Sequence, residues 1–145
     1  MNFKKILIAV DESSSAEKAV QRGFALARKL SAEVLLVSVI DPSATAGNPD
    51  AGIFPDDALA QARDKTKSLL TKLKNKYDKK VKTELAYPIG ELRETVIETA
   101  KKWHADIIVT GTHNASALSG LFSENTGNSI LHHSPVPVFV VPKDS

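Results

Sequence analysis

The chain has 145 residues, of which 42% are hydrophobic and 25% are charged, values that suit one globular domain spanning residues 1–145. Its net charge of +2 comes from interspersed Lys, Arg, Asp and Glu, a pattern that gives no support for a nucleic-acid or membrane partner. The sequence contains no cysteine, which excludes disulfides, thiolate metal ligands and cysteine nucleophiles.

The first segment reads as a buried strand rather than as a targeting signal. Basic residues precede the apolar run, but the run is short and continues into Asp-Glu-Ser instead of a small-residue cleavage site. No apolar run in the sequence reaches the length needed to cross a bilayer. We therefore expect a cytoplasmic protein.

Five short apolar runs are expected to form the strands of a sheet. The first is continuous and β-branched, as in strands buried on both faces, and only the third alternates polar and apolar residues. The alternation places the third run at an edge with one wet face, and Pro137 fits an edge position for the fifth. The runs are Lys5–Val10, Glu33–Ile40, Val81–Tyr87, Asp106–Gly111 and Val136–Val141.

Helical patterns separate these runs. A capping box, Ser14-x-x-Glu17, opens the first helix, because each side chain can satisfy the backbone N–H of the other residue. Apolar residues at helical spacing predict a second helix over Asp56–Tyr77 and a third over Glu91–His104, and Asn128–His133 is a further helix-like segment. The alternation of strands and helices indicates a parallel α/β sheet with helices on both faces.

Two segments do not follow the alternation. Pro42–Pro55 is rich in Ala, Gly, Pro and Asp and has no periodicity, so we expect a long loop over the carboxyl edge of the sheet. Its role is either that of a mobile lid or mere padding. The basic stretch Lys72–Lys82 also contains Asp78 and continues a helical pattern, which indicates the solvated end of the second helix.

Two features point to a ligand site at the carboxyl edge, where open α/β sheets bind their ligands. Asp11 directly follows the first strand, where its carboxylate can accept hydrogen bonds from a ribose hydroxyl or an adenine amino group, or help to hold a metal. The alternative is that Asp11 caps the turn into the first helix. A polar loop of phosphate-binding size follows Gly111 and leads into a helix, an order that favours an anion site made of backbone N–H groups.

Several stretches of the chain resemble the universal stress protein family: ILIAVDESSSAEKAV, LLVSVIDP, PIGELRETVIETAKKWHADIIVTGTHN and SILHHSPVPVFVVP. Only Pro42–Pro55 is uninformative in this respect. The resemblance implies an open parallel five-stranded sheet with strand order 3-2-1-4-5, Rossmann-like and similar to the adenine nucleotide alpha hydrolases. It also implies a homodimer formed through the last strand, Val136–Val141, and an open edge strand fits such pairing.

Some members of that family bind ATP through a glycine-containing motif in the loop after the fourth strand. Here the loop keeps the length found in the nucleotide-binding members but has lost the two glycines that define the motif. Asn114 and Glu124 stand at the two glycine positions, and Ala115 replaces the usual basic residue. Asn tolerates left-handed backbone, whereas Glu124 would repel a triphosphate by about 1 to 4 kcal/mol. The nucleotide-binding residues implied by the resemblance are Ala9, Asp11, Val39, Ile40, Gly111, Thr112, Asn114, Asn125 and Thr126.

We therefore expect a noncatalytic stress-response domain regulated by ATP or another adenine nucleotide, with Mg²⁺ present only if ATP binds. One alternative is a nucleotide-free dimeric interaction module. The other is a slow ATPase or phosphotransferase of the same fold, with Glu124 imagined as the general base. No metal or nucleophile site is indicated, since the four histidines lack ligand spacing and there is no Gly-x-Ser-x-Gly elbow.

Overall fold

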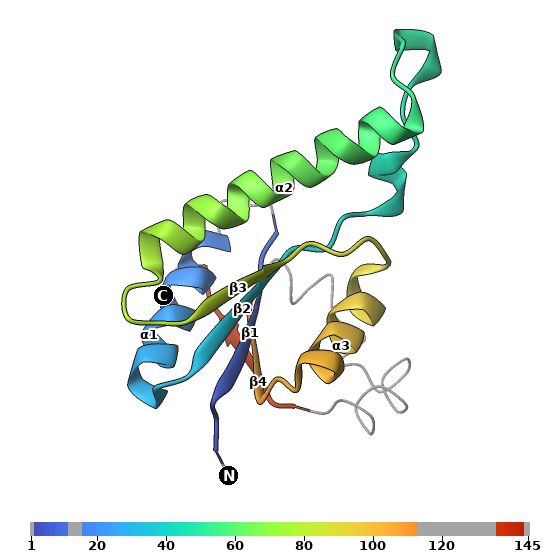
Figure 1. Cartoon of the computed structure of the whole chain (residues 1–145). Coiled ribbons are helices and arrows are strands. Elements are labelled where there is room, and N and C mark those ends of the chain that lie inside the picture. Colours follow the sequence, from blue (N-terminus) through green and yellow to red (C-terminus); the bar gives the residue numbers. More distant parts are fainter. Residues whose placement is uncertain (1, 12–15, 113–135, 144–145) are drawn as a thin grey trace.

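Strands and helices alternate along the chain in a computed structural model that describes residues 2–11, 16–112 and 136–143 (Figure 1). All five strands are parallel, and their order is β3-β2-β1-β4-β5. This confirms the predicted fold, including the edge positions of the third and fifth apolar runs. The strands are β1 (Lys5–Ala9), β2 (Glu33–Val37), β3 (Thr83–Ala86), β4 (Ile107–Gly111) and β5 (Val138–Val141).

The central strand is aligned to its neighbour at its amino end by one aspartate. The Asp106 carboxylate accepts hydrogen bonds from the backbone N–H groups of Lys4 and Lys5, at 2.9 and 3.0 Å. The Asp106 N–H in turn donates to the Lys5 carbonyl at 2.7 Å. These three bonds set the register in which Ile6 pairs with Ile107, because a slip of one residue would break all of them.

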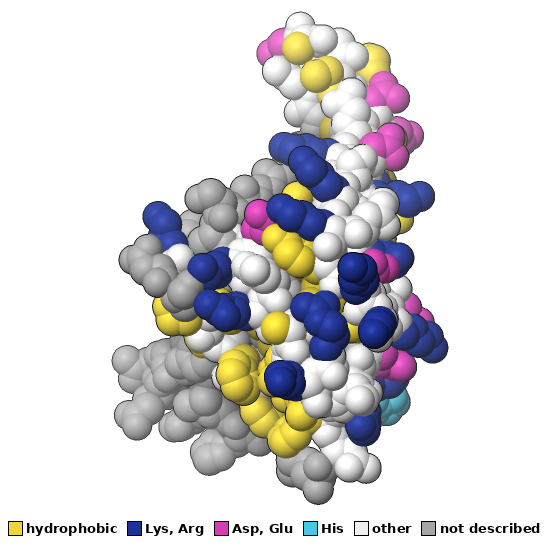
Figure 2. Space-filling view, turned by 90° about the vertical axis from the view of Figure 1, so that its left-hand side faces the viewer, with side chains coloured by type: hydrophobic (Ala, Val, Ile, Leu, Met, Phe, Trp, Pro, Cys, Tyr) yellow, Lys and Arg dark blue, Asp and Glu magenta, His cyan; other side chains and the backbone are white. Residues whose placement is uncertain are grey.

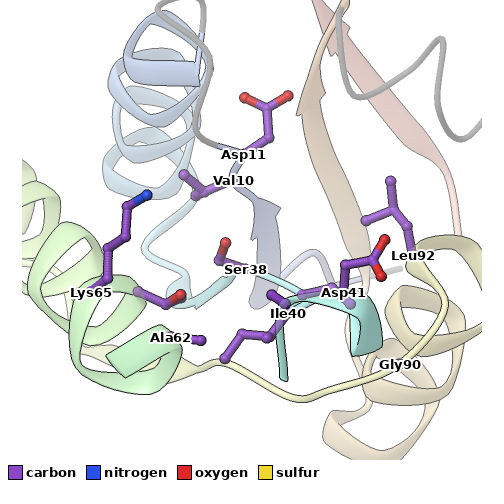
Figure 3. Close-up of a pocket in the computed structure, with 12 residues that line it drawn as sticks. Val10, Asp11, Ser38, Ile40, Asp41, Ala62, Lys65, Gly90 and Leu92 are labelled. Atoms are coloured by element: carbon purple, nitrogen blue, oxygen red, sulfur yellow. The ribbon is translucent and has the colours of Figure 1, made fainter. Parts of the chain in front are cut away.

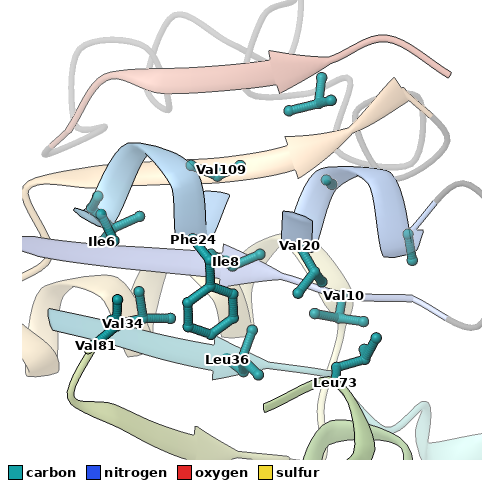
Figure 4. Close-up of a cluster of buried hydrophobic side chains, with 14 of the residues drawn as sticks. Ile6, Ile8, Val10, Val20, Phe24, Val34, Leu36, Leu73, Val81 and Val109 are labelled. Atoms are coloured by element: carbon teal, nitrogen blue, oxygen red, sulfur yellow. The ribbon is translucent and has the colours of Figure 1, made fainter. Parts of the chain in front are cut away.

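Three α-helices in the described part of the chain cover the two faces of the sheet: α1 (Ala16–Leu30), α2 (Pro55–Tyr77) and α3 (Leu92–Trp103). Helices α1 and α2 lie on one face and α3 lies on the other (Figure 1). Alternate residues of each buried strand therefore enter two separate cores. Phe24 of α1 fills the centre of the larger core and stacks on Tyr77 at 6.4 Å between ring centroids (Figure 4).

The helix ends agree with the sequence patterns to within a residue or two. Glu91 is the N-cap of α3, and its carboxylate accepts hydrogen bonds from two backbone N–H groups of the first turn. His104 ends the same helix in the left-handed conformation, with φ of 61°. Ser14 of the predicted capping box and the predicted helix Asn128–His133 lie outside the described residues.

Residues 41–54 form a projecting arm between β2 and α2, in place of the structureless loop that the sequence suggested. The arm contains two 3-10 turns, η1 (Pro42–Thr45) and η2 (Pro49–Ala51). Asn48 and Ile53 exchange two backbone hydrogen bonds, at 2.7 and 2.9 Å, which close the tip on itself. Because α2 follows directly, its first half extends past the sheet together with the arm (Figure 1).

Candidate functional site

A hollow of about 460 Å³ opens at the carboxyl ends of β1 and β2, which is the edge where the sequence predicted a site (Figure 3). The arm and the first half of α2 form one side, and the turn before α3 forms another. Pockets of about 300 to 1,000 Å³ are typical of small-molecule sites. The hollow is therefore large enough for a nucleoside or nucleotide.

Asp11 reaches the mouth of this hollow because the hydrogen bonding of β1 continues past the strand. The Val10 N–H donates to the Val37 carbonyl at 2.7 Å, and Asp11 follows directly (Figure 3). Ala9 lies one step further inside, where its side chain is 3% exposed and belongs to the core beneath α3. Asp11 thus lines the hollow, whereas Ala9 does not.

Apolar side chains from several elements form one wall of the hollow, among them two that follow β2. Beyond β2, the Ile40 N–H donates to the Pro88 carbonyl at 2.8 Å, and the Gly90 N–H donates back to the Ile40 carbonyl at 3.1 Å. This isolated pairing directs Val39 and Ile40 into the lining of the hollow instead of continuing the strand, which the sequence had predicted to run to Ile40. The apolar lining residues are Val10, Val39, Ile40, Ala44, Ala62 and Leu92.

Gly90 lies in close contact with the Thr95 side chain of α3. A Cβ on Gly90 would overlap the Oγ1 atom of Thr95 and would lie 3.4 Å from its Cβ. A larger residue at position 90 would therefore require the Thr95 side chain to rotate or shift. Gly90 and Leu92 both line the hollow on this side.

Polar side chains from four segments complete the lining: Asp11, Ser38, Asp41, Lys65 and Thr66. The Asp41 carboxylate accepts a hydrogen bond from the Ser43 backbone N–H at 2.8 Å. That bond, together with one from the Ser43 hydroxyl, holds the pKa of Asp41 below its ordinary value, so this carboxylate is anionic at neutral pH. An apolar wall facing hydroxyls and carboxylates suits a flat ring that carries hydroxyl or amino groups.

Lys65 is the one polar lining residue of α2 that bears a charge, and the sequence patterns did not single it out. Its side chain extends from α2 toward the end of β1, where Val10 lies (Figure 3). The available signal was its spacing, since Lys65 stands three residues after Ala62, which places the two side chains on the same side of the predicted second helix. The path of the arm, however, is what places this part of α2 above the strand ends, and nothing in the sequence shows that path.

The remaining predicted binding residues either do not line the hollow or lie outside the residues that the structure describes. Gly111 ends β4, where it is buried and pairs with Val141, and the exposed Thr112 follows; neither lines the hollow. Asn114, Asn125 and Thr126 lie outside the described residues, as does Glu124. The structure thus brings Asp11, Val39 and Ile40 together, and the binding roles of all these residues stay a prediction.

Within residues 2–11, 16–112 and 136–143, no group of three or more His, Asp or Glu side chains is placed to hold a metal ion. In the same part of the chain, no helix combines the length and the apolar character that a membrane span requires.

An open parallel sheet with helices on both faces and a lined hollow beyond its carboxyl ends defines a Rossmann-like α/β domain. A profile of the Universal stress protein family matches residues 2–142 of this chain. The chain belongs to that family, as the sequence motifs indicated.

Individual relatives span nearly the same length. Universal stress protein C of Escherichia coli O157:H7 is 28% identical over 144 residues, which cover 98% of this chain and 97% of that protein. A putative universal stress protein of Staphylococcus aureus strain USA300 is 32% identical over 149 residues, covering 97% of this chain and 85% of the relative.

Solved structures of the family share the fold. A universal stress protein from Burkholderia pseudomallei superposes with a TM-score of 0.71 at 22% identity, covering 97% of this chain and 96% of the other. Two further structures have TM-scores of 0.64 and each cover 97% of this chain and 98% of the other. One is a universal stress protein in complex with cAMP, at 18% identity, and the other is the Archaeoglobus fulgidus protein in complex with dAMP, at 20% identity.

Proposed function

We propose that this protein is a noncatalytic, cytoplasmic stress-response domain whose hollow binds an adenine nucleotide as a regulatory ligand. One observation carries the proposal: the carboxylate of Asp11 and the apolar ends Val39 and Ile40 line the same hollow at the carboxyl edge. The cAMP and dAMP complexes of two structural relatives support an adenine nucleotide as the ligand class.

The lining matches the parts of such a ligand. An adenine ring would pack on the apolar wall formed by Val39, Ile40 and Ala62, and burial of its faces would provide most of the affinity. The ribose hydroxyls would donate hydrogen bonds to the Asp11 carboxylate, and hydrogen bonds to a charged group are worth about 1.5 to 3 kcal/mol. Ser38 and Thr66 would supply further hydroxyl partners.

The phosphates are proposed to extend toward the segment that follows β4. In this arrangement Gly111, Thr112, Asn114, Asn125 and Thr126 would offer backbone and side-chain donors. If the ligand is ATP, a bound Mg²⁺ would offset repulsion between Glu124 and the triphosphate. The ligand would act by stabilising one conformation of this edge and so change the surface offered to partners.

Calorimetric titration of the purified protein with AMP, cAMP, ATP with Mg²⁺, and GMP tests the ligand class. We expect binding of at least one adenine nucleotide in the micromolar range and no measurable binding of GMP. Bound nucleotide should also raise the melting temperature in proportion to RT ln(1 + [L]/Kd). Release of phosphate from ATP should not exceed the rate in buffer, since the proposed role is noncatalytic.

Asp11→Asn keeps the shape of the side chain and removes its charge, and we expect it to weaken binding by at least tenfold. Asp64→Asn is the matched control, because Asp64 is exposed on α2 and lies outside the hollow. Equal effects of the two substitutions would contradict the role of Asp11. If no adenine nucleotide binds at millimolar concentration, the nucleotide-free interaction module becomes the better description.

We also propose that two copies of the chain pair through β5. Among the described strands, β5 pairs only with β4, so its outer backbone edge is open to a second strand. Phe139 is 53% exposed and Val140 is 38% exposed, a large apolar surface for an edge strand. A second copy of the same strand would cover both side chains and pair the backbone.

Sedimentation equilibrium tests this pairing. The wild-type chain should sediment as a dimer, and Val140→Lys should shift it toward monomer by placing two cations across the interface. Phe54→Ser is the control, since Phe54 is 60% exposed on the arm rather than on β5. Dissociation by the Phe54 substitution, with the Val140 variant still dimeric, would place the interface on the arm.

A further inference from the structure

We propose that Lys65 pairs with the phosphate nearest the ribose, so that the hollow selects a nucleotide over a nucleoside. The inference rests on the proposed adenine nucleotide function and adds to it the residue that reads the phosphate. Among the described residues that line the hollow, Lys65 is the only cation. Its side chain also borders a second hollow of about 330 Å³ beneath the arm, so it stands where the two spaces meet.

The charge pattern of the sequence gives Lys65 its importance. No Lys or Arg occurs between Lys102 and Lys143, a stretch that includes β4 and the whole segment expected to receive the phosphates. No Lys or Arg occurs between Lys29 and Arg63 either, which removes the end of β2 and the arm as sources of positive charge. A permanent cation for a phosphate at this edge must therefore come from another element, and α2 provides one.

The carboxylates of the hollow make such a cation necessary. Asp11 and Asp41 both line it, and Asp41 is anionic at neutral pH because Ser43 donates two hydrogen bonds to it. A phosphate brought next to two carboxylates would be repelled. An ammonium group next to the phosphate offsets part of this repulsion and forms charge-assisted hydrogen bonds with the phosphate oxygens.

The position of Lys65 on α2 fits the order of the ligand's parts. Lys65 stands three residues after Ala62, so the two share a helix face, and Ala62 belongs to the apolar wall proposed for the base. The aliphatic part of the lysine can continue that wall while its ammonium group reaches toward Val10 and the neighbouring Asp11 (Figure 3). A ribose held by Asp11 would bring its 5′-phosphate next to this group.

A comparison of two ligands in two proteins isolates the pair. Adenosine and AMP differ by the phosphate, and wild type and Lys65→Gln differ by the ammonium group. In calorimetric titrations we expect AMP to bind the wild-type protein about tenfold more tightly than adenosine, and this ratio to fall to about one in Lys65→Gln. The affinity for adenosine should be the same in both proteins, and Lys65→Arg should retain most of the ratio.

Lys67→Gln is the matched control. Lys67 is exposed on the same helix, two residues further along, and it does not line the hollow. Figure 2 shows that Lys and Arg side chains are spread over much of the face that α1 and α2 form, so the loss of any one charge changes the general field slightly. The control removes an equal charge from the same helix, and we expect it to leave the ratio unchanged.

Each outcome decides the matter. If Lys65→Gln weakens adenosine and AMP equally, the lysine supports the wall and does not read the phosphate. If Lys65→Gln and Lys67→Gln lower the ratio alike, a long-range field replaces the proposed pair. If wild type binds adenosine and AMP equally well, the adenine site stands and the role of Lys65 is wrong. If adenosine, AMP, cAMP and ATP all fail to bind, the proposed function itself is overturned.

Discussion

Gly23 lies where α1 packs against the central strands, and replacing it by alanine tests how tightly this contact is built. A Cβ at Gly23 would lie 2.5 Å from Ile8 Cδ1, 2.9 Å from Ile8 Cγ1 and 3.5 Å from Val109 Cγ1. Ile8 is fully buried, so its side chain has no open space into which it could move. Overpacking of this kind costs about 1 to 3 kcal/mol.

Helix propensity acts in the opposite direction. Alanine in a helix interior is better than glycine by about 1 kcal/mol, so we expect Gly23→Ala to lower the free energy of unfolding by about 0 to 2 kcal/mol. The range is wide for a single variant. A double-mutant cycle removes the propensity term, because that term is the same in both backgrounds.

Ile8→Ala deletes both Cδ1 and Cγ1, which are the two closest neighbours of the added methyl group. Alone it should cost about 2 to 5 kcal/mol. In the Ile8→Ala background Gly23→Ala should be neutral or stabilising, which gives a coupling of about 1 kcal/mol or more between the two sites. Urea unfolding followed by the fluorescence of the single tryptophan, Trp103, measures all four proteins. Additive effects within about 0.5 kcal/mol would refute the packing argument.

Three further predictions follow from particular contacts. Phe24→Ala should lower the free energy of unfolding, measured with urea, by about 3 to 5 kcal/mol, because the ring is fully buried. Phe54 is exposed, so Phe54→Ala should lower it by under about 1 kcal/mol. An NMR titration should give Asp41 a pKa below 3.8, and Ser43→Gly should raise it only in part, because the backbone N–H bond is the larger cause. The contribution of that hydrogen bond to stability is complete above the ordinary pKa and is lost as the pH falls through the lowered one. Glu91→Ala should cost about 1 kcal/mol in thermal or urea unfolding through the loss of the α3 cap, and an unchanged stability would show that water replaces it.

The order of strands and helices could be read from the sequence because burial leaves a repeating pattern. β1 lies between two neighbours and two helical layers, so its residues from Ile6 to Ala9 are all apolar. β3 has one wet face, and the alternation in Val81–Tyr87 shows it. The strand order itself came from the resemblance to universal stress proteins rather than from any local pattern.

The candidate site was only partly predictable, because part of it depends on contacts that leave no repeating pattern in the sequence. Asp11 could be found because it follows a strand directly, whereas Lys65 enters the hollow through the path of the arm. That path depends on pairs such as Asn48 with Ile53, whereas the sequence of Pro42–Pro55 is rich in Ala, Gly, Pro and Asp and has no periodicity that would predict the pair. The end of β2 was predicted too late because Ile40 is apolar like the strand, although its partner there is Ile89 outside any strand.

Of the five strands described, the first to be synthesised is the middle strand of the sheet. Ile6 pairs with Val34 soon afterwards, but its other partner, Ile107, comes about a hundred residues later in the chain. At about 5 to 20 residues per second, translation leaves roughly 4 to 14 s between the completion of β2 and the arrival of β4. Throughout that interval one edge of this largely apolar strand has no partner, and such an edge is a template for pairing between chains. Fragments that end before β4 should therefore pellet in centrifugation while the full chain stays in solution, and the cell must protect each nascent copy for that time.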